Sequence, residues 1–116
     1  MRILIIDDDI EVHETLTAFF NSLDYECILT SNAAEGIHKF ATIDPDVVFL
    51  DVRLPDRCGI DVLQELKKLN VRIPVFMMTA YKDAEKVIEA FRYGAKDCLL
   101  KPFNFDYVKN ALASLK

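Results

Sequence analysis

The sequence predicts an α/β fold built around a parallel β-sheet, and two observations support this prediction. Five short apolar runs alternate with five amphipathic segments along the 116 residues, which is the pattern of strands joined by crossover helices. The apolar runs also lack polar alternation, as is typical of strands buried on both faces. Because a chain of this length supports a single hydrophobic core, we expect residues 1–116 to form one domain.

The five predicted strands are rich in large aliphatic residues and cover residues 2–6, 26–30, 47–50, 75–78 and 98–100. The run at 26–30 is the most polar, so we place it at an edge of the sheet. The first strand would then lie inside the sheet, and the strand order would reverse between the first and third strands. A ligand crevice is expected at such a reversal, outside the carboxyl ends of the strands.

Each predicted helix carries its apolar residues on one stripe. The stripes are Val12, Leu16, Phe19, Phe20 and Leu23; Ala33, Ile37, Phe40 and Ala41; Val62, Leu63, Leu66 and Leu69; Ala84, Val87, Ile88 and Phe91; and Val108, Ala111, Leu112 and Leu115. Asn32 and Glu35 have the spacing of a capping box, and Asp83 and Asn104 can cap the two later helices. Gly94 stands where the fourth helix should end.

Composition and charge exclude several function classes. The net charge of −5 argues against direct nucleic-acid binding, which needs clustered Lys and Arg. No apolar run approaches the roughly 20 residues that span a bilayer, and no signal-peptide cleavage site is present, so we expect a cytoplasmic protein without membrane contact. Three cysteines without a CxxC pair favour reduced thiols over a zinc site or disulfides. We interpret the following as solvated surface residues: His13, His38, Lys67, Lys68, Lys82 and Lys86.

Polar side chains follow four of the five predicted strands. The first strand runs into Asp7-Asp8-Asp9, the third into Asp51, the fourth into Thr79 and the fifth into Lys101. Singly, such a residue is more often a cap or turn residue than part of a site, and Asp9 fits a helix N-terminus. Because parallel strands bring their carboxyl ends to one edge of a sheet, we expect the four groups to converge.

The convergence predicts a site for phosphoryl chemistry. Two carboxylates about 4 Å apart repel by roughly 4 kcal/mol at an effective dielectric of 20, so Asp7, Asp8 and Asp51 require protonation or a bridging cation. An open, all-oxygen site favours Mg²⁺. Lys101 could neutralise one phosphoryl oxygen, and Thr79 could donate a hydrogen bond to another. These are the groups that phosphoryl transfer to an aspartate requires.

Several short motifs are similar to those of a known family. They are Ile6-Asp7-Asp8-Asp9, Pro45 through Asp51, Leu54-Pro55 with Gly59, Met78-Thr79-Ala80, Gly94-Ala95 and Lys101-Pro102-Phe103. Over essentially its whole length the sequence resembles the receiver domains of bacterial two-component response regulators. The stretches that begin at Met78 and Lys101 look most like receivers of the nitrogen-regulation type or of the single-domain phosphorelay type.

The resemblance implies a doubly wound, flavodoxin-like sheet of five parallel strands in the order 2-1-3-4-5, flanked by five helices. It also implies that Asp51 is the phospho-acceptor, which receives a phosphoryl group from a sensor histidine kinase or a histidine phosphotransfer protein. Mg²⁺ would be ligated directly by Asp8 and Asp51, through water by Asp7, and by the backbone carbonyl of Arg53. The chain would be a signalling switch and not an enzyme, because it catalyses only its own phosphotransfer and autodephosphorylation.

The resemblance further implies how the switch operates. Lys101 would contact the phosphoryl group, with a cis bond to Pro102 that turns the lysine into the site. Thr79 would move toward the phosphoryl group and rearrange the following loop. This movement would bias the face made by the fourth helix, fifth strand and fifth helix, which would control an output domain or partner and could form a homodimer.

Two residues depart from the family pattern. Receivers usually have an aromatic residue three positions before the lysine, and this chain has Cys98. A thiol cannot fill the groove left by a ring, so we hypothesise that other elements, such as Tyr81, carry the output. Cys58 precedes Gly59 where an acid or amide is common, which affects the turn and not the chemistry.

Other functions fit the sequence less well. A degenerate receiver that acts only as a dimerisation or scaffold module would explain Cys98, but the acidic and phosphate-contacting residues are all present. A haloacid-dehalogenase-type phosphatase would need an acid at position 53, which is Arg53. A flavodoxin would need a phosphate-binding loop after the first strand, where three aspartates would repel phosphate. A nucleotide-binding P-loop is absent.

Overall fold

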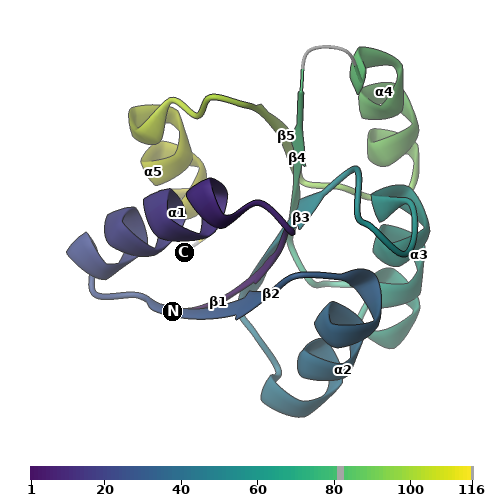
Figure 1. The fold of residues 1–116 in the computed structure, drawn as a ribbon, viewed down its shortest axis with the longest axis horizontal. Coiled ribbons are helices and arrows are strands. Elements are labelled where there is room, and N and C mark those ends of the chain that lie inside the picture. Colours follow the sequence, from purple (N-terminus) through teal and green to yellow (C-terminus); the bar gives the residue numbers. More distant parts are fainter. Residues whose placement is uncertain (81–82, 116) are drawn as a thin grey trace.

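The computed structural model describes residues 1–80 and 83–115, in which strands and helices alternate along the chain (Figure 1). Their bounds are β1 Arg2–Ile6, α1 Ile10–Ser22, β2 Glu26–Thr30, α2 Ala33–Ile43, β3 Val47–Asp51, α3 Gly59–Leu69, β4 Val75–Thr79, α4 Ala84–Arg92, β5 Asp97–Leu100 and α5 Phe105–Ala113. The predicted strands and helices are therefore confirmed, with strand ends that differ by at most one residue.

The strands form one parallel sheet in the order β2-β1-β3-β4-β5. This confirms the expected doubly wound topology, including the place of β2 at an edge and the reversal of strand order between β1 and β3. All residues of β3 and β4 are buried, whereas the edge strand β2 has exposed positions. The difference follows from position, because an edge strand has a neighbour on one side only.

Helices cover both faces of the sheet and create two hydrophobic cores. Figure 1 shows α1 and α5 on one side and α2, α3 and α4 on the other. Successive strand residues point to opposite faces, so Ile3 and Ile5 of β1 enter the core with Phe20, whereas Leu4 and Ile6 enter the core with Leu63. Phe49 contacts Phe20 and Phe76, with ring centroids 5.1 and 5.2 Å apart, within the α1–α5 core. Burial on both faces explains the uninterrupted apolar runs.

Capping bonds fix where two of the predicted helices begin. The side chain of Asn32 accepts a hydrogen bond from the Glu35 N–H at 2.8 Å, and that of Asn104 accepts one from the Tyr107 N–H at 3.1 Å. The carboxylate of Glu35 reaches back to the Ser31 N–H, one residue before the expected partner. Asp83 also occupies an N-cap position, but its side chain makes no capping hydrogen bond. The predicted capping role of Asp83 is therefore wrong in this structure.

Several predicted burial patterns are also wrong. Ile88 and Phe91 of α4 are 69% and 49% exposed, and Leu69 at the end of α3 is 56% exposed. Conversely, His13 and Lys67 are half-buried: the His13 Nε2 lies 3.2 Å from the Thr30 carbonyl oxygen, and the Lys67 Nζ donates to the Ile73 carbonyl at 2.5 Å. Long polar side chains on a helix can fold back onto neighbouring loops, which helical periodicity does not report.

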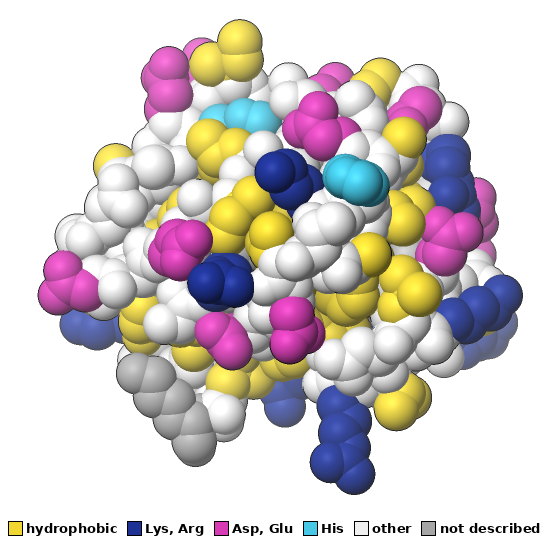
Figure 2. Space-filling model, turned by 90° about the horizontal axis from the view of Figure 1, so that it is seen from below, with side chains coloured by type: hydrophobic (Ala, Val, Ile, Leu, Met, Phe, Trp, Pro, Cys, Tyr) yellow, Lys and Arg dark blue, Asp and Glu magenta, His cyan; other side chains and the backbone are white. Residues whose placement is uncertain are grey.

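The surface charges agree with the negative net charge of the chain. On the face drawn in Figure 2, acidic and basic side chains are interspersed among hydrophobic ones, without a broad basic field. No described helix has the length and apolar character needed to cross a membrane.

Gly59 holds the start of α3 tightly against the end of β3. Its N–H donates to the Val52 carbonyl at 2.6 Å. A Cβ at this position would lie 2.0 Å from the Asp51 carbonyl oxygen, which is backbone and cannot rotate away. Only a residue without a side chain fits here.

Replacement of this glycine tests that packing. We expect Gly59→Ala to lower the free energy of unfolding by about 2–4 kcal/mol, because backbone must shift to admit the methyl group. Gly94→Ala is the matched control. Gly94 has φ +96 but faces only the flexible Lys67 side chain, so its cost should be about 1–2 kcal/mol. Urea denaturation measures both, and an equal or smaller loss for Gly59→Ala would contradict the packing argument.

Candidate functional site

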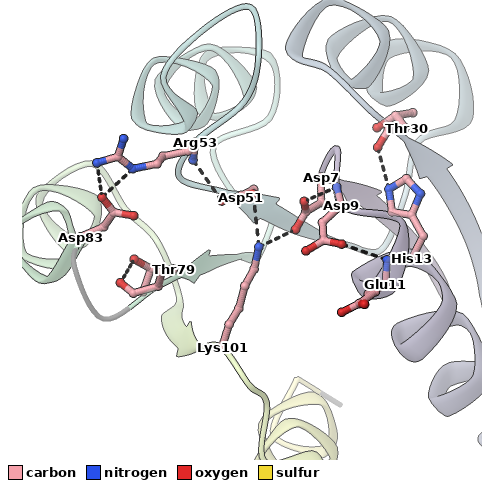
Figure 3. A network of polar contacts seen from close by, with 11 residues as sticks. Asp7, Asp9, Glu11, His13, Thr30, Asp51, Arg53, Thr79, Asp83 and Lys101 are labelled. Atoms are coloured by element: carbon pink, nitrogen blue, oxygen red, sulfur yellow. Dashed lines mark hydrogen bonds and ion pairs between the residues drawn. The ribbon is translucent and has the colours of Figure 1, made fainter.

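The carboxyl edge of the sheet gathers the predicted polar residues. Asp51 and Thr79 are the last residues of β3 and β4, and Asp7 and Lys101 directly follow β1 and β5. The strand register sets their neighbours, because Ile6 pairs with Leu50 and Asp51 pairs with Met78. Figure 3 shows the side chains of Asp7, Asp51 and Lys101 pointing toward one another from three strands. The expected convergence is therefore found.

Three carboxylates form the acidic part of the site. Asp7, Asp8 and Asp51 each place a carboxylate oxygen so that all three lie within 4.8 Å of one another. Asp7 is fully buried and Asp51 is 8% exposed, whereas Asp8 is exposed. The Asp9 N–H donates to Asp7 at 2.9 Å and helps to orient this carboxylate. The cluster thus has buried members and one that faces solvent.

Lys101 compensates the two buried acids. Its Nζ lies 2.9 Å from Asp7 Oδ2 and 3.3 Å from Asp51 Oδ2. The Lys101 N–H donates to the Thr79 carbonyl at 2.9 Å, and the bond to Pro102 is cis, as the resemblance implied. Burial by itself lowers the pKa of Lys101, but the hydrogen bonds and charges of both carboxylates raise it above its ordinary value. The lysine is therefore held as an ammonium between the acids.

The carboxyl group of Asp51 titrates far above the usual range of aspartate. Burial is the largest cause and, with the charge of Asp7, raises the pKa to about 6, while the Arg53 N–H and the charge of Lys101 oppose the shift. The Arg53 N–H donates to Asp51 Oδ1 at 3.0 Å. Asp51 therefore needs positive charge beyond that of Lys101 to stay fully ionised in this buried position.

Thr79 lies at the same edge but does not bond to Asp51. Its hydroxyl donates to the carbonyl of Ala80 at 3.1 Å, and the residue is 3% exposed (Figure 3). Sequence reasoning placed Thr79 correctly on the sheet edge.

The guanidinium of Arg53 has a partner that sequence reasoning missed. Its Nε and Nη2 lie 2.7 and 2.6 Å from Asp83 Oδ1, across the opening of the site (Figure 3). Asp83 is 3% exposed, so a buried acid is paired with a largely exposed arginine. In the sequence, an acid directly before a helix suggests an N-cap. The ion pair becomes visible only in the tertiary structure, where the loops after β3 and β4 come together.

These residues enclose a cleft of about 360 Å³. Its lining consists of Asp8, Asp9, Asp51, Arg53, Leu54, Pro55, Ala80, Asp83 and Lys101. Carboxylates, a guanidinium and an ammonium face one open space at the strand-order reversal, as expected for a doubly wound sheet.

The two cysteines that depart from the family pattern are not part of the cleft lining. Cys98 is half-buried beside Met77, and burial with the charge of Asp97 raises its pKa to about 11. Cys58 forms an isolated β-bridge with Arg53 and precedes α3 without a capping bond. Tyr81, to which we assigned the output as a hypothesis, lies outside the described residues.

A doubly wound parallel sheet with three carboxylates and one ammonium at its carboxyl edge defines the class of receiver-type signalling domains. The chain belongs to the response regulator receiver domain family, whose family model matches residues 3–113. The resemblance inferred from the motifs is confirmed. The chain is therefore a receiver domain of the two-component type, a signalling switch. The finer assignment to a receiver subtype stays a prediction.

Individual relatives agree with the family. The chain is 42% identical to the regulatory protein AtoC of Escherichia coli over 105 residues and 36% identical to the transcriptional regulatory protein ZraR of Klebsiella oxytoca over 111 residues. These matches cover 90% and 96% of the chain but only 23% and 25% of the relatives. The chain thus spans about a quarter of the length of these relatives.

Solved structures show the same fold. A receiver domain protein from Clostridium thermocellum superposes with a TM-score of 0.93 at 28% identity, covering 98% of this chain and 92% of the other. The receiver domain of NtrX from Brucella abortus gives 0.92 at 26% identity, covering 97% and 96%.

The raised pKa of Asp51 predicts a pH-dependent stability difference. In chelator, the folded protein binds a proton on Asp51 up to about pH 6, whereas the unfolded chain loses it near pH 4. Stability from this group is therefore present below pH 4 and is lost as the pH rises through about 6. We therefore expect the free energy of unfolding of Asp51→Asn to rise relative to that of wild type by roughly 1–2 kcal/mol between pH 4 and pH 7, after allowance for solvent screening.

Urea titrations at several pH values measure this difference. Asp61→Asn, which removes an exposed acid from the first turn of α3, should show no comparable trend. A difference between Asp51→Asn and wild type that does not change with pH would contradict the burial argument.

Proposed function

We propose that Asp51 accepts a phosphoryl group from a histidine kinase or a histidine phosphotransfer protein, and that residues 1–116 act as one phosphorylation-dependent switch. The observation that carries the proposal is the position of Lys101, whose Nζ contacts both Asp7 and Asp51 at the opening of the acidic cleft. An ammonium fixed beside the acceptor can neutralise an incoming phosphoryl oxygen, which is the main task in phosphoryl transfer.

In the transfer step, a carboxylate oxygen of Asp51 forms a bond to phosphorus. The bond from phosphorus to the donor imidazole nitrogen breaks, and that nitrogen keeps the electron pair and takes up a proton. The product is an acyl phosphate on Asp51. The Arg53 N–H and the Lys101 ammonium already contact the two acceptor oxygens at 3.0 and 3.3 Å, so little reorganisation is needed before transfer.

The acidic cluster fits Mg²⁺ by its donor set. All three groups are carboxylates with oxygens within 4.8 Å of one another, and a hard, partly hydrated divalent ion suits such a site. Asp8 and Asp51 would hold the ion directly, Asp7 through water, and the Arg53 carbonyl would be a further ligand. When bound, Mg²⁺ supplies positive charge to the transferring phosphoryl oxygens and relieves the repulsion among the acids.

The response to phosphorylation would begin at Thr79. Its hydroxyl now donates to the Ala80 carbonyl, and a phosphoryl oxygen on Asp51 offers a stronger, charged acceptor. Exchange of acceptor would move the start of the loop between β4 and α4. Two loop states with different affinity for the phosphoryl group are sufficient for a switch.

The face of α4, β5 and α5 is the proposed output surface. It exposes large apolar side chains, which include Ile88, Phe91, Leu100 and Tyr107. Exposed apolar patches of this kind mark interaction surfaces. Because the curated relatives are much longer than this chain, we propose that the face contacts an output domain, a partner or a second copy of the domain.

Phosphorylation with a small donor tests the proposed function. In acetyl phosphate and Mg²⁺, we expect intact-mass measurement to show one added phosphoryl group, which is absent with chelator and in Asp51→Asn. Asp61→Asn is the matched acid control and should be modified normally. A folded wild-type protein that stays unmodified would favour the alternative, a degenerate receiver that serves only as a scaffold.

Metal binding gives a second prediction. Because Mg²⁺ binds the folded acidic cluster and not the unfolded chain, it should raise the melting temperature near neutral pH, with about 1.4 kcal/mol of added stability at a concentration ten times the Kd. Calorimetry with and without Mg²⁺ measures the shift. Asp8→Asn should lose most of it, and an undiminished shift in that variant would contradict the assignment of Asp8 as a direct ligand.

A further inference from the structure

The ion pair between Arg53 and Asp83 links the phospho-acceptor loop to the start of α4. Arg53 lies two residues after Asp51, and its N–H donates to the Asp51 carboxylate. The same residue extends its guanidinium across the cleft to Asp83, at 2.6 and 2.7 Å. Arg53 and Asp83 line the cleft together with Asp51. One residue therefore contacts both the acceptor and the helix that begins the proposed output face.

Asp83 differs from the helix caps that make hydrogen bonds. Asp9, Asn32 and Asn104 have extended backbones, with ψ of 116, 170 and 108, and each side chain caps its helix. Asp83 has φ −103 and ψ 23, and its carboxylate is turned to Arg53. Aspartate is among the best N-cap residues when its side chain reaches the first-turn N–H groups. In this structure Asp83 does not fill that role, because its backbone is not extended and its carboxylate is bonded to Arg53.

A phosphoryl group on Asp51 would compete for the same guanidinium. Arg53 lies two residues after Asp51 and lines the same cleft as Asp51 and Asp83, so its guanidinium faces the space that a phosphoryl group on Asp51 would enter. A phosphoryl group carries more negative charge than the Asp83 carboxylate and offers several oxygens to the arginine fork.

We propose that Arg53 is an exchange switch: it holds Asp83 away from the α4 N-terminus before phosphorylation, and transfers to the phosphoryl group afterwards, which lets Asp83 cap α4. The inference rests on the proposed phosphorylation of Asp51. It gives Arg53 and Asp83 a positioning role, in addition to the roles proposed above for the acids, the lysine and the threonine of the site. The exchange couples chemistry at β3 to the order of the first turn of α4.

Hydrogen exchange of the Glu85 and Lys86 amides reports on this cap, because these are the first-turn N–H groups that an Asp83 cap would bind. Each sample is measured by NMR without donor, and again with acetyl phosphate and Mg²⁺ in excess, and the modification of Asp51 is quantified by intact mass. In wild type we expect exchange of these amides to slow about fivefold on phosphorylation, the gain typical of an N-cap.

Three variants separate the cap from a general change in the loop. Asp83→Asn retains a capping side chain but loses the charge that holds Arg53, so exchange should be slow in both states. Asp83→Ala has neither a capping side chain nor the charge that holds Arg53, so exchange should be fast in both states. Arg53→Gln, at an exposed side chain, should release Asp83 and give slow exchange without phosphorylation. Glu65→Gln breaks the Arg57–Glu65 pair, which lies outside the cleft lining, and should behave as wild type.

Two results would overturn the inference. One is wild-type exchange at these amides that does not change although Asp51 is fully phosphorylated. The other is Arg53→Gln exchange that is as fast as that of unphosphorylated wild type. If intact mass shows no modification of wild-type Asp51, the proposed function itself fails. The restraint of the cap by Arg53 would still be tested, because it predicts fast exchange in unphosphorylated wild type and slow exchange in Arg53→Gln.

Discussion

The crowding of negative charge around Lys101 is the constraint on which the functional edge depends. Asp7 and Asp51 are buried side by side at the ends of adjacent strands, and the ammonium of Lys101 lies within 2.9 and 3.3 Å of them. Buried like charges are costly unless an opposite charge compensates them. One lysine cannot fully compensate three carboxylates, which leaves the site prepared for additional cations. The electrostatic cost of the site and the reactivity that we propose for it therefore have the same origin.

The rest of the fold positions this edge rigidly. Two hydrophobic cores clamp the sheet from both faces, and the register of β1, β3 and β4 determines which strand ends are neighbours. Gly59 brings α3 into direct contact with the end of β3, and the Lys101 N–H ties the end of β5 to Thr79. A well-packed core transmits such constraints because it cannot deform continuously. Asp51 is thereby fixed on the side of the sheet, while the contacts of Thr79 and Arg53 lie on the side of the loops.

We propose that two of those loop contacts exchange partners on phosphorylation. The Thr79 hydroxyl donates to Ala80, and Arg53 is paired with Asp83. Both donors come from the carboxyl edge of the sheet that carries Asp51, and both are directed toward the segment that leads into α4. That segment leads to α4, whose side chains Ile88 and Phe91 are exposed although the helical stripe assigned them to the core. This arrangement offers a physical route from the acceptor to the proposed output face that does not require an aromatic residue at position 98.

The order of elements, the doubly wound class and the polar residues at the carboxyl edge of the sheet could be predicted from the sequence. These follow from local rules, since buried parallel strands are continuously apolar and polar residues at their ends must share one edge. Tertiary structure alone decided the partners of Arg53, Asp83, His13 and Lys67, and the exposure of Ile88 and Phe91. Such contacts join segments distant in sequence through long side chains, whose directions depend on loop geometry and are not encoded in the hydrophobic period.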